Sequence, residues 1–152
     1  MHVEARMAEN GLIMPEVGAP KGNYVGVVQV GNLLFLAGHL PQVPGGPLLT
    51  GKVGAENSLE KGYEAAKLCG LNICATLKNH LGDLDRVKRV VKLVGFVNCV
   101  DTFTQQPAVM NGCSDVIVKV FGEKGKHARS AVGTNALPLG VAVEVEAIVE
   151  FE

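Results

Sequence analysis

One arginine and two glutamates near the C-terminus are the side chains best suited to chemistry in this sequence. Arg129 lies among small residues in the stretch HARSAVGTNALPLGVAVEVEA, residues 127–147, and Glu144 and Glu146 follow it after a turn at 137–140. Guanidinium groups bind anions and carboxylates accept protons, so these groups could act together on a ligand. Alternatively, Arg129 could form an ion pair across the final hairpin, and the glutamates could line a solvated strand face.

A glycine at the end of another segment favours the chemical interpretation. The stretch LLFLAGHLP, residues 33–41, is typical of a buried strand that ends in Gly38. A glycine at this place lets the backbone approach a ligand closely.

The patterning of the chain predicts the elements that must position these residues. Apolar residues recur at three- and four-residue spacings in 57–82 and again in 107–122, which predicts two amphipathic helices. Apolar runs bounded by turn residues predict strands, the last two of them joined as a hairpin. The expected strands cover 24–30, 33–38, 86–99, 130–136 and 141–151, and a short helix is expected at 2–10.

The order hairpin, helix, strand, helix, hairpin predicts an α+β fold with two helices on one face of a single mixed sheet. The second sheet face is then bare, and such chains usually cover it with copies of themselves. We therefore expect an oligomer with sites between its subunits. The 152 residues suit a single core. Residues 1–21 are expected to form an N-terminal extension of short helix and linker, and 22–152 the main domain.

The composition argues against several classes of function. The formal net charge is −1 and aromatic residues make up 5 % of the chain, so a nucleic acid or an anionic membrane is not an expected partner. Cys69, Cys74, Cys99 and Cys113 form no C-x-x-C motif and lack a histidine at ligand spacing, so we expect reduced, half-buried thiols and no metal. The apolar runs fall short of the roughly 20 residues of a membrane span, and a cytoplasmic protein is expected.

Several motifs, in order along the chain, are similar to those of the Rid family, the reactive intermediate deaminases. These proteins are also called YjgF-like and are often labelled the L-PSP endoribonuclease family. The motifs are GNYV, GNLLFLAGHLP, MNGCSDVIVKVFG, ARSAV and ALPLGVAVEVEAI, and they span about residues 22–151. The resemblance implies a chorismate-mutase-like fold and a homotrimer with three clefts between subunits. It also implies hydrolysis of 2-imino acids, such as 2-iminopropanoate and its enamine form 2-aminoacrylate, to 2-keto acids and ammonia without a cofactor.

The resemblance implies roles for individual residues. Arg129 would hold the substrate carboxylate with its planar fork, and Glu144 would orient or deprotonate the attacking water, with Glu146 in support. The residues that would border the substrate are Tyr24, Gly38, His39, Asn111 and Ala131.

Three positions depart from the commonest family pattern and leave the preferred substrate open. His39 stands where many members have Gln, His127 where they have Pro, and Ala131 where the best-known members have Cys. Two other functions also stay open. One is a non-catalytic module that senses a small carboxylate such as a keto acid, and the other is a ribonuclease or translation inhibitor with His39 and His127 as acid and base.

Overall fold

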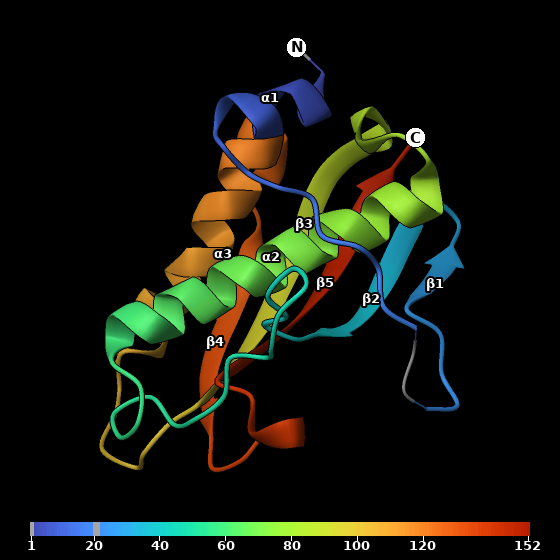
Figure 1. Ribbon diagram of the computed structural model, residues 1–152. Helices are drawn as coiled ribbons and strands as arrows, with labels where there is room; N and C mark the ends of the chain where they lie inside the picture. The colour runs from blue at the N-terminus through green and yellow to red at the C-terminus, as the bar shows by residue number, and fades with distance from the viewer. Residues whose placement is uncertain (1, 20–21) are drawn as a thin grey trace.

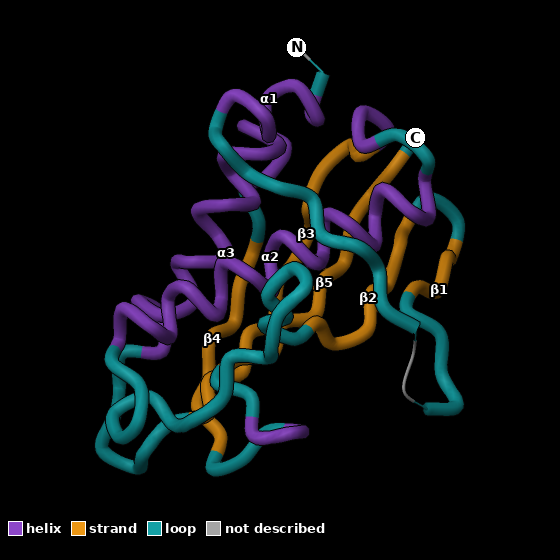
Figure 2. Tube along the Cα trace, viewed as in Figure 1, coloured by secondary structure: helices purple, strands orange, loops and turns teal. Residues whose placement is uncertain are grey.

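A five-stranded sheet carries two long helices on one face (Figure 1) in the computed structural model, which describes residues 2–19 and 22–152. The tube in Figure 2 follows the same arrangement by secondary structure. The strands are β1 (Val27–Val30), β2 (Leu33–His39), β3 (Val87–Asn98), β4 (Ala128–Thr134) and β5 (Val143–Phe151). The helices are α1 (Val3–Glu9), α2 (Leu59–Leu81) and α3 (Gln106–Phe121). Positions 1, 20 and 21 of the expected N-terminal extension lie outside the described residues.

The sheet is mixed, as predicted, and its strand order is β1-β2-β5-β3-β4. Neighbouring strands are antiparallel except β3 and β4, which are parallel. The predicted final hairpin is wrong, because β3 lies between β4 and β5. One face of β5 is continuously buried at Val143, Val145, Ala147 and Val149, so this strand occupies the centre of the sheet. Strand β4 has no fully buried residue and forms an edge.

The two long helices begin and end where the sequence predicts. The Ser58 hydroxyl accepts a hydrogen bond from the Lys61 amide at 3.2 Å and caps α2, which ends at Gly82 in the left-handed conformation. Pro107 lies in the first turn of α3. The helices approach closely at Gly112, where a Cβ would overlap the carbonyl oxygen of Tyr63. This contact fixes α3 against α2.

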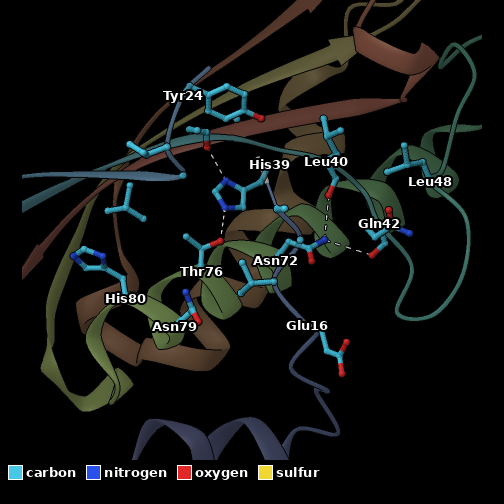
Figure 3. A pocket seen from close by; sticks show the side chains of 18 residues that line it. Glu16, Tyr24, His39, Leu40, Gln42, Leu48, Asn72, Thr76, Asn79 and His80 are labelled. Carbon is cyan, nitrogen blue, oxygen red and sulfur yellow. Dashed lines mark hydrogen bonds between the residues drawn. The ribbon is translucent and has the colours of Figure 1, made fainter. Parts of the chain in front are cut away.

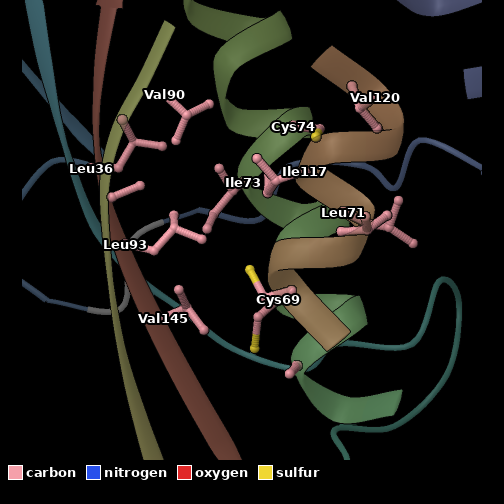
Figure 4. Packing of buried hydrophobic residues seen from close by; sticks show 14 of the residues in the cluster. Leu36, Cys69, Leu71, Ile73, Cys74, Val90, Leu93, Ile117, Val120 and Val145 are labelled. Atoms are coloured by element: carbon pink, nitrogen blue, oxygen red, sulfur yellow. The ribbon is translucent and has the colours of Figure 1, made fainter. Parts of the chain in front are cut away.

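The core lies between these helices and the inner face of the sheet. In Figure 4, Ile73 of α2 and Ile117 of α3 point towards Leu93 of β3, and all three are fully buried. The four cysteines are free thiols, as expected, but all are buried rather than half-buried. They act as small apolar side chains in this layer.

The N-terminal helix α1 packs on α3 and contributes to the core. Val3 and Met7 are buried, and the carboxylate of Asp85 accepts a hydrogen bond from the Val3 amide at 2.7 Å. Within the described residues, no helix combines the length and the apolar character that a membrane span requires.

The outer face of the sheet is not covered by a helix. It carries Glu144 and Glu146, which alternate along β5 with its buried valines as predicted. Apolar side chains on the same face are exposed, among them Val28 at 50 %, Phe35 at 41 % and Val132 at 45 %. The outer face therefore combines exposed apolar side chains with charged ones, among them Glu144 and Glu146 near its centre and Lys92 beside them.

Candidate functional site

Arg129 stands at the edge of the sheet, between β4 and α3. It pairs in register with the buried Leu93, so its side chain leaves the sheet on the helix side. Its Nη1 donates to Oδ1 of Asn111 at 2.9 Å and to Oγ of Ser114 at 3.1 Å, both on α3. None of the ion pairs among residues 2–19 and 22–152 includes Arg129. The helix thus holds a cation whose charge has no acidic partner in the described chain.

Arg129 is hydrogen-bonded to Ser114, which is in turn hydrogen-bonded to His127. Nδ1 of His127 lies 2.6 Å from the Gly125 carbonyl oxygen, and Nε2 lies 2.9 Å from Oγ of Ser114. Burial lowers the pKa of His127, and the positive charge of Arg129 lowers it further. His127 was noted from the sequence as a departure from the family pattern and as a candidate acid or base of a ribonuclease, whereas Ser114 was missed. The signal available for Ser114 was its position three residues after Asn111, on the same face of a helix.

Ala131 lies on the same side of β4 as Arg129. It pairs in register with Gly95 of β3 and packs against the core. Asn111, Arg129 and Ala131 therefore form one group of predicted site residues, at the β4 edge.

Glu144 lies on the outer face of the sheet and packs against Gly38. It pairs in register with Phe96, and the β2–β5 register shifts between Leu36 and His39, beside Gly38. A Cβ on Gly38 would lie 2.5 Å from Oε1 and 2.9 Å from Cδ of Glu144, so glycine is needed for this packing. Burial raises the pKa of the Glu144 carboxyl, and the negative charge of Glu146 adds to the rise. No hydrogen bond from the described residues reaches this carboxylate.

A cavity of about 490 Å³ opens beside Gly38 (Figure 3), a volume within the usual range of small-molecule sites. Its walls are formed by residues 16–19 and 24–27, the end of β2, the loop that follows β2, and the C-terminal half of α2. Tyr24, Gly38 and His39 all line it. Tyr24 was expected on the first strand, but β1 begins only at Val27, and Tyr24 is 53 % exposed in the preceding segment.

His39 is fixed at the cavity wall by both of its ring nitrogens. Nδ1 lies 2.6 Å from the Ala37 carbonyl oxygen and Nε2 lies 2.7 Å from Oγ1 of Thr76 (Figure 3). Burial lowers the pKa of His39. The rings of His39 and His127 are thus both fully engaged in internal hydrogen bonds, so neither is free to act as the acid or base of a ribonuclease in this conformation.

The two groups of predicted site residues do not meet within one chain. Arg129 points to the helix side, whereas Glu144 lies on the outer face, and β3 separates their strands. Two strand spacings place β4 and β5 about 10 Å apart. The alternative of an ion pair across a final hairpin is wrong for the same reason. The chain thus presents an arginine at one edge and, on the outer face, a carboxylate that packs against Gly38.

No cluster of three or more metal-ligating side chains occurs among the residues that the structure describes. The candidate site therefore consists of a guanidinium, a carboxylate and neutral hydrogen-bonding groups.

Comparisons with known proteins agree on one family. The family described as "YjgF/chorismate mutase-like, putative endoribonuclease" matches residues 4–151. Protein TCP17 of Trypanosoma cruzi is 48 % identical over 150 residues, which cover 98 % of this chain and 94 % of the relative. The crystal structure of Atu1372 from Agrobacterium tumefaciens has a TM-score of 0.92 at 43 % identity, covering 99 % of this chain and 92 % of that one. RidA from the Antarctic bacterium Psychrobacter sp. PAMC 21119 has a TM-score of 0.63 at 28 % identity, covering 90 % and 94 %.

Proposed function

Because the chain belongs to the YjgF/RidA family of chorismate mutase-like proteins, we propose that it hydrolyses 2-imino acids and their enamine forms to 2-keto acids and ammonia. The observation that carries the proposal is the guanidinium of Arg129, which Asn111 and Ser114 hold at 2.9 and 3.1 Å without an acidic partner among the described residues. A planar cation held in this way is suited to a two-point contact with a substrate carboxylate.

Glu144 supplies the base of the proposed reaction. Its raised pKa makes the carboxylate a better proton acceptor than an exposed glutamate. It takes a proton from water as the water oxygen bonds to the imine carbon. The π electrons of the C=N bond move to the nitrogen, which is protonated in the imine form that reacts, and Glu144 returns its proton to the nitrogen of the resulting carbinolamine. The C–N bond then breaks and ammonia leaves, while the carbinolamine hydroxyl gives its proton to Glu144 and the carbonyl group forms.

The proposed site is completed between copies of the chain in a homotrimer. Arg129 of one copy would lie beside Glu144 on the outer face of the next copy, near Gly38, which also lines the cavity. The exposed apolar side chains of the outer face, among them Val28 and Phe35, support an interface of this kind. The substrate would then bind in a cleft that neither copy forms alone.

The test uses imino acids generated in place by an amino-acid oxidase, with semicarbazide as a competing trap for the imine. The wild type is expected to lower semicarbazone formation and to raise the share of the imine that is released as keto acid and ammonia. Arg129→Ala is expected to abolish this effect, while size-exclusion chromatography with light scattering finds the oligomer intact. Arg129→Lys keeps the charge but loses the planar fork, so it should restore only part of the activity.

Two results would overturn the proposal. One is full activity in Arg129→Ala. The other is a wild-type protein that hydrolyses none of the imino acids tested but whose melting temperature rises with keto acids, which would make the same residues a binding site without turnover.

A further inference from the structure

The donor and acceptor of each hydrogen bond that links Gly125, His127, Ser114 and Arg129 can be assigned. The Gly125 carbonyl oxygen can only accept, so Nδ1 of His127, 2.6 Å away, carries a proton. Nε2 of the neutral ring is then an acceptor, and the Ser114 hydroxyl, 2.9 Å away, donates to it. The single hydroxyl proton of Ser114 is thus donated to His127. The lone pairs of Ser114 Oγ accept a hydrogen bond from Nη1 of Arg129 at 3.1 Å.

This arrangement determines which edge of the guanidinium is available to a ligand. Arginine has five N–H donors, two of them on Nη1. Asn111 and Ser114 accept both Nη1 protons, at 2.9 and 3.1 Å. Among residues 2–19 and 22–152, no hydrogen bond uses the three donors on Nε and Nη2. Two of them lie side by side with the spacing that a carboxylate needs for two parallel hydrogen bonds.

We propose that Ser114 and His127 are positioning residues that anchor Nη1 of Arg129 and so present its Nε–Nη2 edge to the substrate carboxylate. The identity of that carboxylate rests on the proposed function, whereas the anchoring is a property of this chain alone. His127 acts through Ser114, because its ring contacts Ser114 and Gly125 but makes no hydrogen bond to Arg129.

The chemical state of His127 agrees with this role. Burial lowers the pKa of the ring, which favours the neutral form that the anchoring requires. A protonated ring would donate from Nε2 to Ser114, whose oxygen would then receive two donors from cationic groups. The hydroxyl proton would in turn lose its acceptor.

The first experiment measures steady-state kinetics with imino acids for three variants. Ser114→Ala should raise KM about ten-fold and leave kcat within about two-fold, because the guanidinium loses one of the two acceptors that orient it for the substrate carboxylate. Ser114→Thr keeps a hydroxyl and should restore most of the affinity. His127→Phe keeps an aromatic ring but removes the acceptor, and should raise KM about three-fold or more.

Ser130→Ala is the matched control. It removes a hydroxyl next to Arg129 on the same strand, but Ser130 pairs with Val94 and points to the other face of the sheet. KM should stay at the wild-type value in this variant. An unchanged KM in Ser114→Ala, in an enzyme that is otherwise active, would overturn the positioning role and leave the proposed function standing.

The second experiment does not depend on turnover. The ¹⁵N resonances of the His127 ring should report the neutral tautomer with its proton on Nδ1, and Ser114→Ala should shift the Nε2 resonance. Pyruvate, titrated by calorimetry as a carboxylate probe, should bind about ten-fold more weakly to Ser114→Ala than to the wild type.

These readouts separate the two proposals. A protein that binds pyruvate through the anchored arginine but hydrolyses no imino acid would refute the deaminase and keep the positioning role. A proton on Nε2 in the wild type would overturn the positioning role, whatever the activity. A wild type that neither hydrolyses imino acids nor binds pyruvate would overturn both proposals.

Discussion

Glu144 has a raised pKa and a fixed position on the outer face of β5. Its carboxylate lies against Gly38 with a pKa raised by burial and by Glu146. Glu144→Gln keeps the shape of the side chain but removes the proton acceptor, so kcat should fall by about 100-fold or more while KM changes little. Steady-state kinetics with oxidase-generated imines measures both constants. Glu146→Gln, a change on the same face, should keep most of kcat, and a Glu144→Gln protein with half of the wild-type kcat would refute Glu144 as the base.

His39 should make stability depend on pH in the range where histidines titrate. Because burial holds its pKa below the ordinary 6.5 in the folded protein, the unfolded chain takes up the proton first as the pH falls. Acidification from pH 7 therefore lowers the free energy of unfolding, and the loss is complete below the folded pKa. Urea denaturation between pH 8 and pH 5 measures this slope.

His39→Gln should flatten the slope without removing it, because the pKa of His127 is also lowered. His80→Gln, which removes an exposed histidine of α2, is the control for losing an imidazole at the surface. A slope in His39→Gln equal to that of the wild type would contradict the assignment.

At the scale of the elements, the end of β2 sets the position of Glu144. A methyl group on Gly38 would meet the carboxylate of Glu144 at 2.5 Å, and that carboxylate is the flexible end of its side chain. Gly38→Ala should therefore move the carboxylate rather than the strand. We expect kcat/KM to fall about 100-fold, as a displacement of about 1 Å in a reacting group can produce, with a change in stability below about 1 kcal/mol.

Gly26→Ala is the matched control for this change. Gly26 lines the same cavity, and a Cβ there would have no atom within 4 Å. Kinetics and thermal denaturation of the two variants separate displacement of Glu144 from a general effect of adding a methyl group. Equal losses of activity in both variants would contradict the role of Gly38.

Local sequence signals were sufficient to predict where most helices and strands lie along the chain, but not which strands are neighbours in the sheet. Ser58 and Gly82 bound α2 because capping acts within a few residues. The prediction of a final hairpin was wrong because strand pairing depends on which strand is buried at the centre of the sheet, and this involves residues far apart in the sequence. Here β5 lies between β2 and β3. The same error hid the separation of Arg129 from Glu144. The residue types of the proposed site were predicted from the sequence, but the sheet face on which each of them lies follows from strand register.

Considered as a whole molecule, one chain presents two incomplete halves of the proposed site. The β4 edge offers an anchored guanidinium, and the outer face offers a carboxylate that packs against Gly38. Exposed apolar side chains on that face, among them Phe35 and Val132, would be buried by a second copy. In a ring of copies related by rotation, the β4 edge of each copy would lie against the outer face of the next copy. One site would then form at each interface.

This arrangement predicts complementation between two inactive proteins. Arg129→Ala and Glu144→Gln subunits, each inactive alone, are unfolded together in equal amounts and refolded. If each site takes its arginine from one copy and its glutamate from the next, about a quarter of the interfaces should contain both groups and about a quarter of wild-type activity should return. Mixing Arg129→Ala with the double variant Arg129→Ala/Glu144→Gln supplies no arginine and should stay inactive. If the first mixture also stays inactive although mass spectrometry finds mixed oligomers, the site is not shared between copies, and one chain must bring Arg129 and Glu144 together by a rearrangement of its own sheet.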